Sequence, residues 1–117
     1  MDFNAAILAH MKWKDRIRDS VNGGQAIDTA VVAKDDQCDL GRWLVSANAA
    51  DKGLPEYSDL KQKHAHFHRT AADTINQLRA KPAEAGSLLG NTSPYGEASS
   101  ACVLAISKLR DRVAAGK

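Results

Sequence analysis

The sequence predicts an all-α protein, built as an antiparallel four-helix bundle with an additional short helix that carries Cys38. Apolar residues recur at spacings of three, four and seven in four segments, which is the period of an α-helix, and no segment keeps the alternation of a strand. Aromatic residues make up only 5% of the 117 residues, whereas a β-sandwich needs many aromatic and β-branched side chains. Short connections favour antiparallel neighbours. A chain of this length forms one domain, residues 1–117, around one core.

The first helix is expected over residues 3–22. Its apolar stripe consists of Phe3, Ile7, His10 and Ile17. Asp2 can cap its first turn, and residues 22–24 (Asn-Gly-Gly) supply a left-handed stop. Residues 25–34 are apolar and β-branched, but a lone strand has no partner, so this segment is expected to form a helical turn or an extended connector.

The short second helix is expected over residues 35–48, because the carboxylates at its start (Asp35 and Asp36) suit a helix N-terminus. The third helix is expected to start after Leu54-Pro55-Glu56, with the proline at its entrance, and to continue to about Lys81, where Pro82 prevents extension. Its apolar stripe is Tyr57, Leu60, His64, Phe67, His68, Ala71, Ile75 and Leu78. Residues 82–89 are expected to hold a helical turn before the last helix, residues 95–115. That helix presents an inner stripe of Ala98, Cys102, Ala105, Leu109 and Val113.

The charge pattern excludes several classes of partner. The 16 basic and 14 acidic residues are spread along the chain and give a formal charge of +2, so neither nucleic acid nor a membrane surface is expected as a partner. No apolar segment approaches the roughly 20 residues that span a bilayer, and no basic, apolar signal segment is recognisable at the start. A cytoplasmic protein with free or metal-bound cysteines is therefore expected.

Three of the four histidines occupy positions where a helix core normally has leucine. His10 lies on the first stripe, and His64 and His68 lie one turn apart on the apolar face of the third helix. His66 points about 160° away from that pair and should face solvent. Each unsatisfied buried imidazole nitrogen costs about 1–3 kcal/mol, and one shared divalent ion would satisfy all three rings. A histidine pair at this spacing is, by itself, more often incidental than metal-binding.

Cys38 strengthens the case for a metal. At the start of a short helix the dipole favours the thiolate, and a thiolate with three imidazoles is a ligand set suited to Zn²⁺. The alternative is that Cys38 is a small core residue, which is also the interpretation for Cys102. A di-iron carboxylate site is not supported, because none of the three glutamates lies three residues before a histidine. Trp13 and Trp43 are expected to pack over the metal-bearing end.

Three ordered sequence blocks resemble a known family. Residues 10–14 (HMKWK) fit His-x-x-Trp-Lys, residues 38–44 (CDLGRWL) fit Cys-x-Leu-Gly-x-Trp-Leu, and residues 60–68 (LKQKHAHFH) fit Leu-x-x-x-His-x-x-Phe-His. Together, over about residues 3–110, they resemble the chemoreceptor zinc-binding (CZB) domain.

The resemblance implies an all-helical bundle that holds one zinc ion through three histidines and one cysteine. The ligands it implies are His10, Cys38, His64 and His68. It also implies a homodimer and a regulatory module of bacterial chemoreceptors or diguanylate cyclases, in which zinc occupancy or cysteine chemistry controls the output. A chain of this length leaves no room for a signalling domain, so a free-standing member or an excised domain is expected.

The predicted function is therefore a zinc-dependent sensory or regulatory module. Four protein ligands would leave no water on the metal to activate, and the sequence has no phosphate-binding glycine loop, so no enzyme is expected. The alternative is a structural helical dimerisation protein that uses zinc only as a staple.

Overall fold

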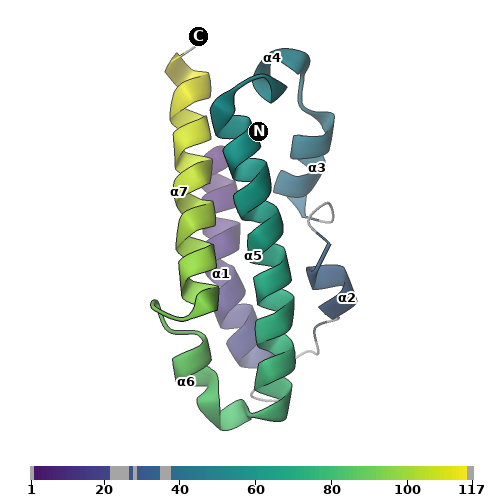
Figure 1. Cartoon of the computed structure of the whole chain (residues 1–117), viewed down its shortest axis with the longest axis vertical. Coiled ribbons are helices and arrows are strands. Elements are labelled where there is room, and N and C mark those ends of the chain that lie inside the picture. The colour runs from purple at the N-terminus through teal and green to yellow at the C-terminus, as the bar shows by residue number, and fades with distance from the viewer. Residues whose placement is uncertain (1, 22–26, 28, 35–37, 116–117) are drawn as a thin grey trace.

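The computed structural model describes residues 2–21, 27, 29–34 and 38–115 of the chain (Figure 1). Its elements are α1 (Phe3–Val21), α2 (Thr29–Val32), α3 (Asp39–Ser46), α4 (Ala49–Lys52), α5 (Pro55–Ala80), the 3₁₀ turn η1 (Pro82–Glu84), α6 (Ala85–Leu88) and α7 (Pro94–Ala115). All regular structure within these ranges is helical, which confirms the predicted all-α class.

The long helices α1, α5 and α7 lie side by side and form the body of the molecule (Figure 1). The short helices α2 and α3 lie along α5, on the side away from α7 (Figure 1). The described part of the chain holds three long helices, so the predicted four-helix bundle is not confirmed. Of the segment expected to form the second helix, residues 35–48, the described part (38–48) is helical over α3.

The end of α3 is set by the capping chemistry around Asn48. The backbone of Ala47 is extended, which ends α3, and the side chain of Asn48 accepts a hydrogen bond of 2.8 Å from the Asp51 amide. An asparagine that caps the next helix starts a new element instead of prolonging the previous one. The result is the four-residue helix α4, which the apolar pattern does not predict.

The remaining boundaries lie close to the predicted ones. Asp2 caps α1 as expected, accepting a hydrogen bond of 3.0 Å from the amide of Ala5. Helix α5 ends just before Lys81 and Pro82, and the predicted helical turn after it is present as η1 and α6. The expected glycine stop at residues 22–24 and the acidic start at residues 35–36 lie outside the described residues.

The core lies where α1, α5 and α7 meet. Its largest fully buried side chains are Tyr95, Phe67, Ile17, Leu40, Leu60, Ile75, Leu78, Leu89, Ile106, Leu109, His64 and Cys102. All eight members of the stripe predicted for α5 are buried, and Cys102 is a packed core residue, as expected. The hydroxyl of Tyr57 donates to the carbonyl of Leu44 and so holds α3 against α5. No described helix is long and apolar enough to cross a bilayer.

A close backbone approach positions the start of α7. A Cβ atom at Gly96 would collide with the carbonyl oxygens of Gly90 and Asn91, so only glycine fits there. Ser93 reinforces the contact, since its hydroxyl accepts from the Gly96 amide at 3.0 Å and donates to the Gly90 carbonyl at 2.6 Å.

Candidate metal centre

His10 points from α1 into the interior, where its side chain is 2% exposed. Its Nδ1 lies 2.7 Å from the carbonyl oxygen of Ala6. A carbonyl can only accept, so Nδ1 carries the proton and Nε2 carries a lone pair. That Nε2 is buried and has no hydrogen-bond partner among the described residues. The protein therefore holds an imidazole in the form that binds a metal, with its donor atom unused.

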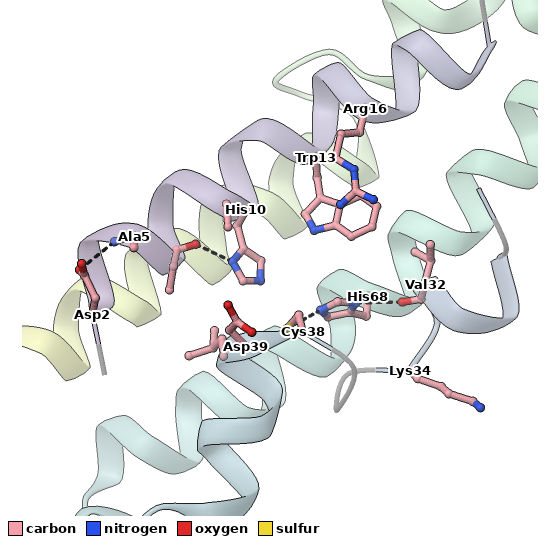
Figure 2. A pocket seen from close by; sticks show the side chains of 13 residues that line it. Asp2, Ala5, His10, Trp13, Arg16, Val32, Lys34, Cys38, Asp39 and His68 are labelled. Carbon is pink, nitrogen blue, oxygen red and sulfur yellow. Dashed lines mark hydrogen bonds between the residues drawn. The ribbon is translucent and has the colours of Figure 1, made fainter. Parts of the chain in front are cut away.

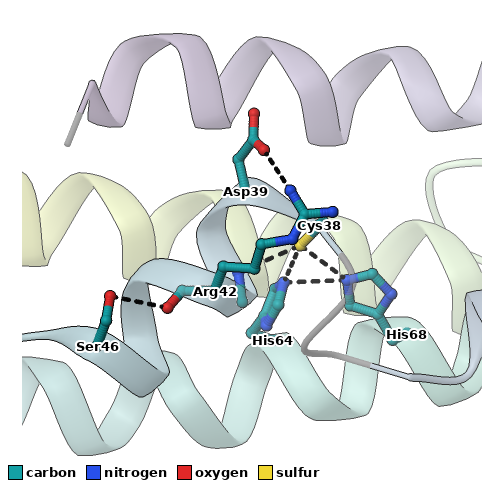
Figure 3. A network of polar contacts seen from close by, with 7 residues as sticks. Cys38, Asp39, Arg42, Ser46, His64 and His68 are labelled. Atoms are coloured by element: carbon teal, nitrogen blue, oxygen red, sulfur yellow. Dashed lines mark hydrogen bonds and ion pairs between the residues drawn. The ribbon is translucent and has the colours of Figure 1, made fainter.

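His64 and His68 extend from α5 toward the same point. Both rings are buried, and their Nε2 atoms lie 3.0 Å apart (Figure 3). The Nδ1 of His68 lies 2.8 Å from the carbonyl oxygen of Val32 on α2, so this ring also presents an unprotonated Nε2. A carbonyl that orients a histidine in this way is typical of the outer shell of metal sites. His66, by contrast, is exposed, as the helical period predicts.

Cys38 supplies a sulfur atom to this pair. It is the N-cap of α3, and its Sγ accepts from the amide of Gly41 at 3.3 Å. The same Sγ lies 3.2 Å from Nε2 of His64 and 3.6 Å from Nε2 of His68 (Figure 3). The side chain that caps α3 is thus the same one that contacts the imidazoles of α5, so the start of α3 and the position of the sulfur depend on each other.

The donor atoms of Cys38, His64 and His68 are spaced nearly as in a tetrahedral zinc site. With Zn–N of about 2.0–2.1 Å and Zn–S of about 2.3 Å, tetrahedral geometry separates ligand atoms by about 3.3–3.6 Å. The three separations among Cys38, His64 and His68 lie near that range, and one donor atom from each of the four residues, His10 included, lies within 4.8 Å of the others. The structure therefore brings all four sequence-predicted residues together, and their donor set fits one metal ion.

Burial keeps the imidazoles in the neutral form. It lowers the pKa of His64 to about 3, with further lowering from the nearby His68 and His10. Burial also lowers the pKa of His10, an effect that the hydrogen bond to Ala6 opposes and the neighbouring His68 reinforces. Neutral imidazole is the form that coordinates a metal, so these rings are ready as ligands at neutral pH.

The thiol of Cys38 departs from the expectation. Burial raises its pKa, and although the amides of Gly41 and Leu40 act in the opposite direction, they do not outweigh it. The helix N-terminus alone therefore does not produce a thiolate here. A coordinated cation deprotonates a thiol outright, which makes the anionic sulfur a consequence of metal binding.

One side of the cluster borders a cavity of about 550 Å³ between α1, Val32 and the start of α3 (Figure 2). Trp13 lines it, with the guanidinium of Arg16 4.0 Å from the centre of its ring. Trp43 does not line it and packs edge-on against Phe3, at 5.3 Å between ring centres. Of the two tryptophans expected over the metal-bearing end, Trp13 is the one that lines the cavity.

Comparison with known proteins agrees with this geometry. The sequence model of the chemoreceptor zinc-binding domain matches residues 10–75, more than half of the chain and a range that contains all four clustered residues. The chain therefore belongs to the CZB family. No curated protein and no solved structure shows a significant match to it.

Proposed function

We propose that His10, Cys38, His64 and His68 bind one Zn²⁺ ion and that the domain is a regulatory module controlled through this site. The observation that carries the proposal is the convergence of four donors in a buried place. The carbonyl partners of His10 and His68 leave both Nε2 lone pairs directed at the cluster, and the Nε2 of His10 has no hydrogen-bond partner among the described residues. A divalent cation would accept both lone pairs and would give the buried Nε2 of His10 a partner.

The metal would connect three parts of the chain that are far apart in sequence. The donors come from α1, from the cap of α3 and from two successive turns of α5. Since such a site does not pre-exist in the unfolded chain, zinc binding contributes to the free energy of folding. With four protein ligands the coordination shell is closed, which supports a non-catalytic role.

Regulation would follow from the weakest of these connections. Helix α3 has eight residues and is held by its cap, by Tyr57 and by its apolar face, so loss of zinc or oxidation of the Cys38 sulfur would loosen it from α5. A partner that recognises one of the two states would then respond to zinc or to an oxidant. We place this module in the cytoplasm, as a bundle of antiparallel helices that forms a homodimer and acts on a signalling protein of the chemoreceptor or diguanylate cyclase type.

A structural staple is the second candidate, and the burial of the cluster favours it, because a buried ion exchanges slowly with solvent. The zinc affinity separates the two functions. A dissociation constant near the free zinc concentration of the cell supports zinc sensing, whereas a site that is always filled supports the staple or leaves only the oxidation of Cys38 as a signal.

Metal analysis of the purified chain tests the site itself. We expect one zinc per chain, and we expect Cys38→Ser to weaken zinc binding by roughly 100-fold or more, since even an outer-shell partner contributes about 10–100-fold. His66→Ala is the matched control, because it removes an imidazole from the same turn of α5 that faces solvent. Equal zinc affinity of the two variants would contradict the assignment of Cys38. Light scattering of the zinc-loaded and zinc-free chain tests the homodimer.

A further inference from the structure

The cavity beside the metal centre has the size of a ligand site. Its volume of about 550 Å³ is far larger than the roughly 30 Å³ that one water occupies and falls within the range of about 300–1,000 Å³ of small-molecule sites. His10, Cys38 and His68 form part of its wall, so a molecule in the cavity would lie against three of the four clustered residues (Figure 2).

The remaining wall is mostly apolar. Helix α1 contributes Ala5, Ala6 and Ala9, whose small side chains leave the space open. The indole of Trp13 and the side chain of Leu40 complete an apolar surface around it. This lining fits the hydrocarbon part of a small organic molecule and gives a bare inorganic ion little to contact.

Two cations, Arg16 and Lys34, and two carboxylates, Asp2 and Asp39, line the cavity. Both carboxylates have partners: Asp39 pairs with Arg42 at 3.1 Å, and Asp2 accepts from the Ala5 amide. Arg16 stacks on Trp13, and no carboxylate among the described residues pairs with it. Figure 2 shows the Arg16 side chain beside the indole, on the same wall as His10. A guanidinium placed over a ring in this way still offers N–H groups to an anion.

We propose that this cavity binds a small carboxylate with an apolar body, whose head pairs with Arg16 and whose body packs against Trp13 and Ala9. The coupling part of this proposal rests on the proposed zinc site. Because ligand and metal share the side chains of His10, Cys38 and His68, each changes the affinity for the other by the same factor. The domain would then respond to a small organic anion as well as to zinc.

Hexanoate is a suitable probe, and the two tryptophans provide an internal control. In a titration of the zinc-loaded, ¹⁵N-labelled full chain, we expect the indole N–H resonance of Trp13 to shift and saturate. The resonance of Trp43, which lies outside the cavity, should stay in place. Trp43→Phe assigns the two signals. Hexanamide, which has the same body without the charge, should bind more weakly.

Three variants locate the site. Arg16→Gln should weaken hexanoate binding about tenfold, the typical contribution of a charge-assisted hydrogen bond. Arg18→Gln removes an arginine from the same helix that pairs with Asp15 at 3.6 Å and does not line the cavity, so it should leave the affinity unchanged. Ala9→Leu keeps every charge and adds three carbon atoms to the cavity wall, so it should weaken binding by taking up part of the space.

A Trp13 resonance that does not respond to millimolar hexanoate would overturn the proposal, as would equal affinities of the Arg16 and Arg18 variants. The zinc content, measured on the same sample, separates this failure from failure of the proposed function. If the chain holds zinc but ignores hexanoate, the anion site is wrong and the metal site stands. If Arg16-dependent binding occurs in a chain that takes no zinc, the anion site stands without its coupling to a metal.

Discussion

Acid should destabilise the metal-free protein through His64. Its folded-state pKa is about 3, against an ordinary value of 6.5 in the unfolded chain. As the pH falls below 6.5 the unfolded chain takes up the proton first, so the contribution of His64 is complete above pH 6.5 and is lost as the pH falls toward 3. Lowering the pH from 7.5 to 5 should cost about 2 kcal/mol from this ring alone, at about 1.36 kcal/mol for each of the 1.5 pH units below 6.5. Down to pH 3 the loss reaches about 4 kcal/mol, a large part of the stability of many small domains.

Urea unfolding followed by circular dichroism, in the presence of a chelator and at a series of pH values, measures this loss. His64→Gln removes the titrating group, so its free energy of unfolding should change by about 2 kcal/mol less between pH 7.5 and 5 than that of the parent chain. His10 retains its own acid sensitivity in that variant, because its pKa is also lowered. His66→Gln alters an exposed ring and should keep the parent slope. If His64→Gln and the parent show the same pH dependence, the burial argument for His64 is wrong.

Three further outcomes are expected. Chelation at pH 7.5 should lower the melting temperature and raise the urea sensitivity of the chain, and an unchanged melting curve would show that the metal contributes nothing to folding. Gly96→Ala should destabilise the chain by about 1–3 kcal/mol, because the new methyl group meets the Gly90 carbonyl, while Gly86→Ala, which meets nothing within 4 Å, should be neutral or slightly stabilising in the same thermal assay. Leu78→Ala should cost about 2–5 kcal/mol in urea unfolding, whereas Leu8→Ala, at a position that is 56% exposed, should cost little.

The long helices are the part of the fold that local sequence determines. In α5 the apolar stripe, the proline at its entrance and the proline beyond its end all agree. The predicted end differs from the observed Ala80 by one residue, and the helix begins at Pro55, slightly earlier than the predicted start after Leu54-Pro55-Glu56. The segment between α1 and α5 behaves differently. It has too few periodic apolar residues to define one helix, and the cap at Asn48 starts a separate helix within it. Its arrangement therefore depends on contacts with α5, which no local sequence pattern predicts.

The candidate site, like the fold, was only partly predictable from local sequence. The helical period places His64 and His68 on one face and His66 on the other, without any tertiary information. That His10 and Cys38 reach this face depends on how α1 and α3 pack, and the family motif supplied that link. The rise in the pKa of Cys38 was not predicted, because it comes from burial among neighbours that are distant in sequence. The cavity was not predicted either, since it results from small residues on α1 facing two other segments.

The hydrogen bond from His68 to the carbonyl of Val32 has a consequence for how such domains diverge. The atom that selects the tautomer belongs to the main chain, so any amino acid that fits the buried position of Val32 supplies it. Relatives can therefore carry another apolar side chain of similar size there and preserve the ring's orientation, and a position whose side chain never touches the metal can still contribute to metal affinity. A proline or an insertion in that turn would test whether metal affinity depends on this carbonyl, because either change alters the path of the backbone while all four donor residues stay in the sequence.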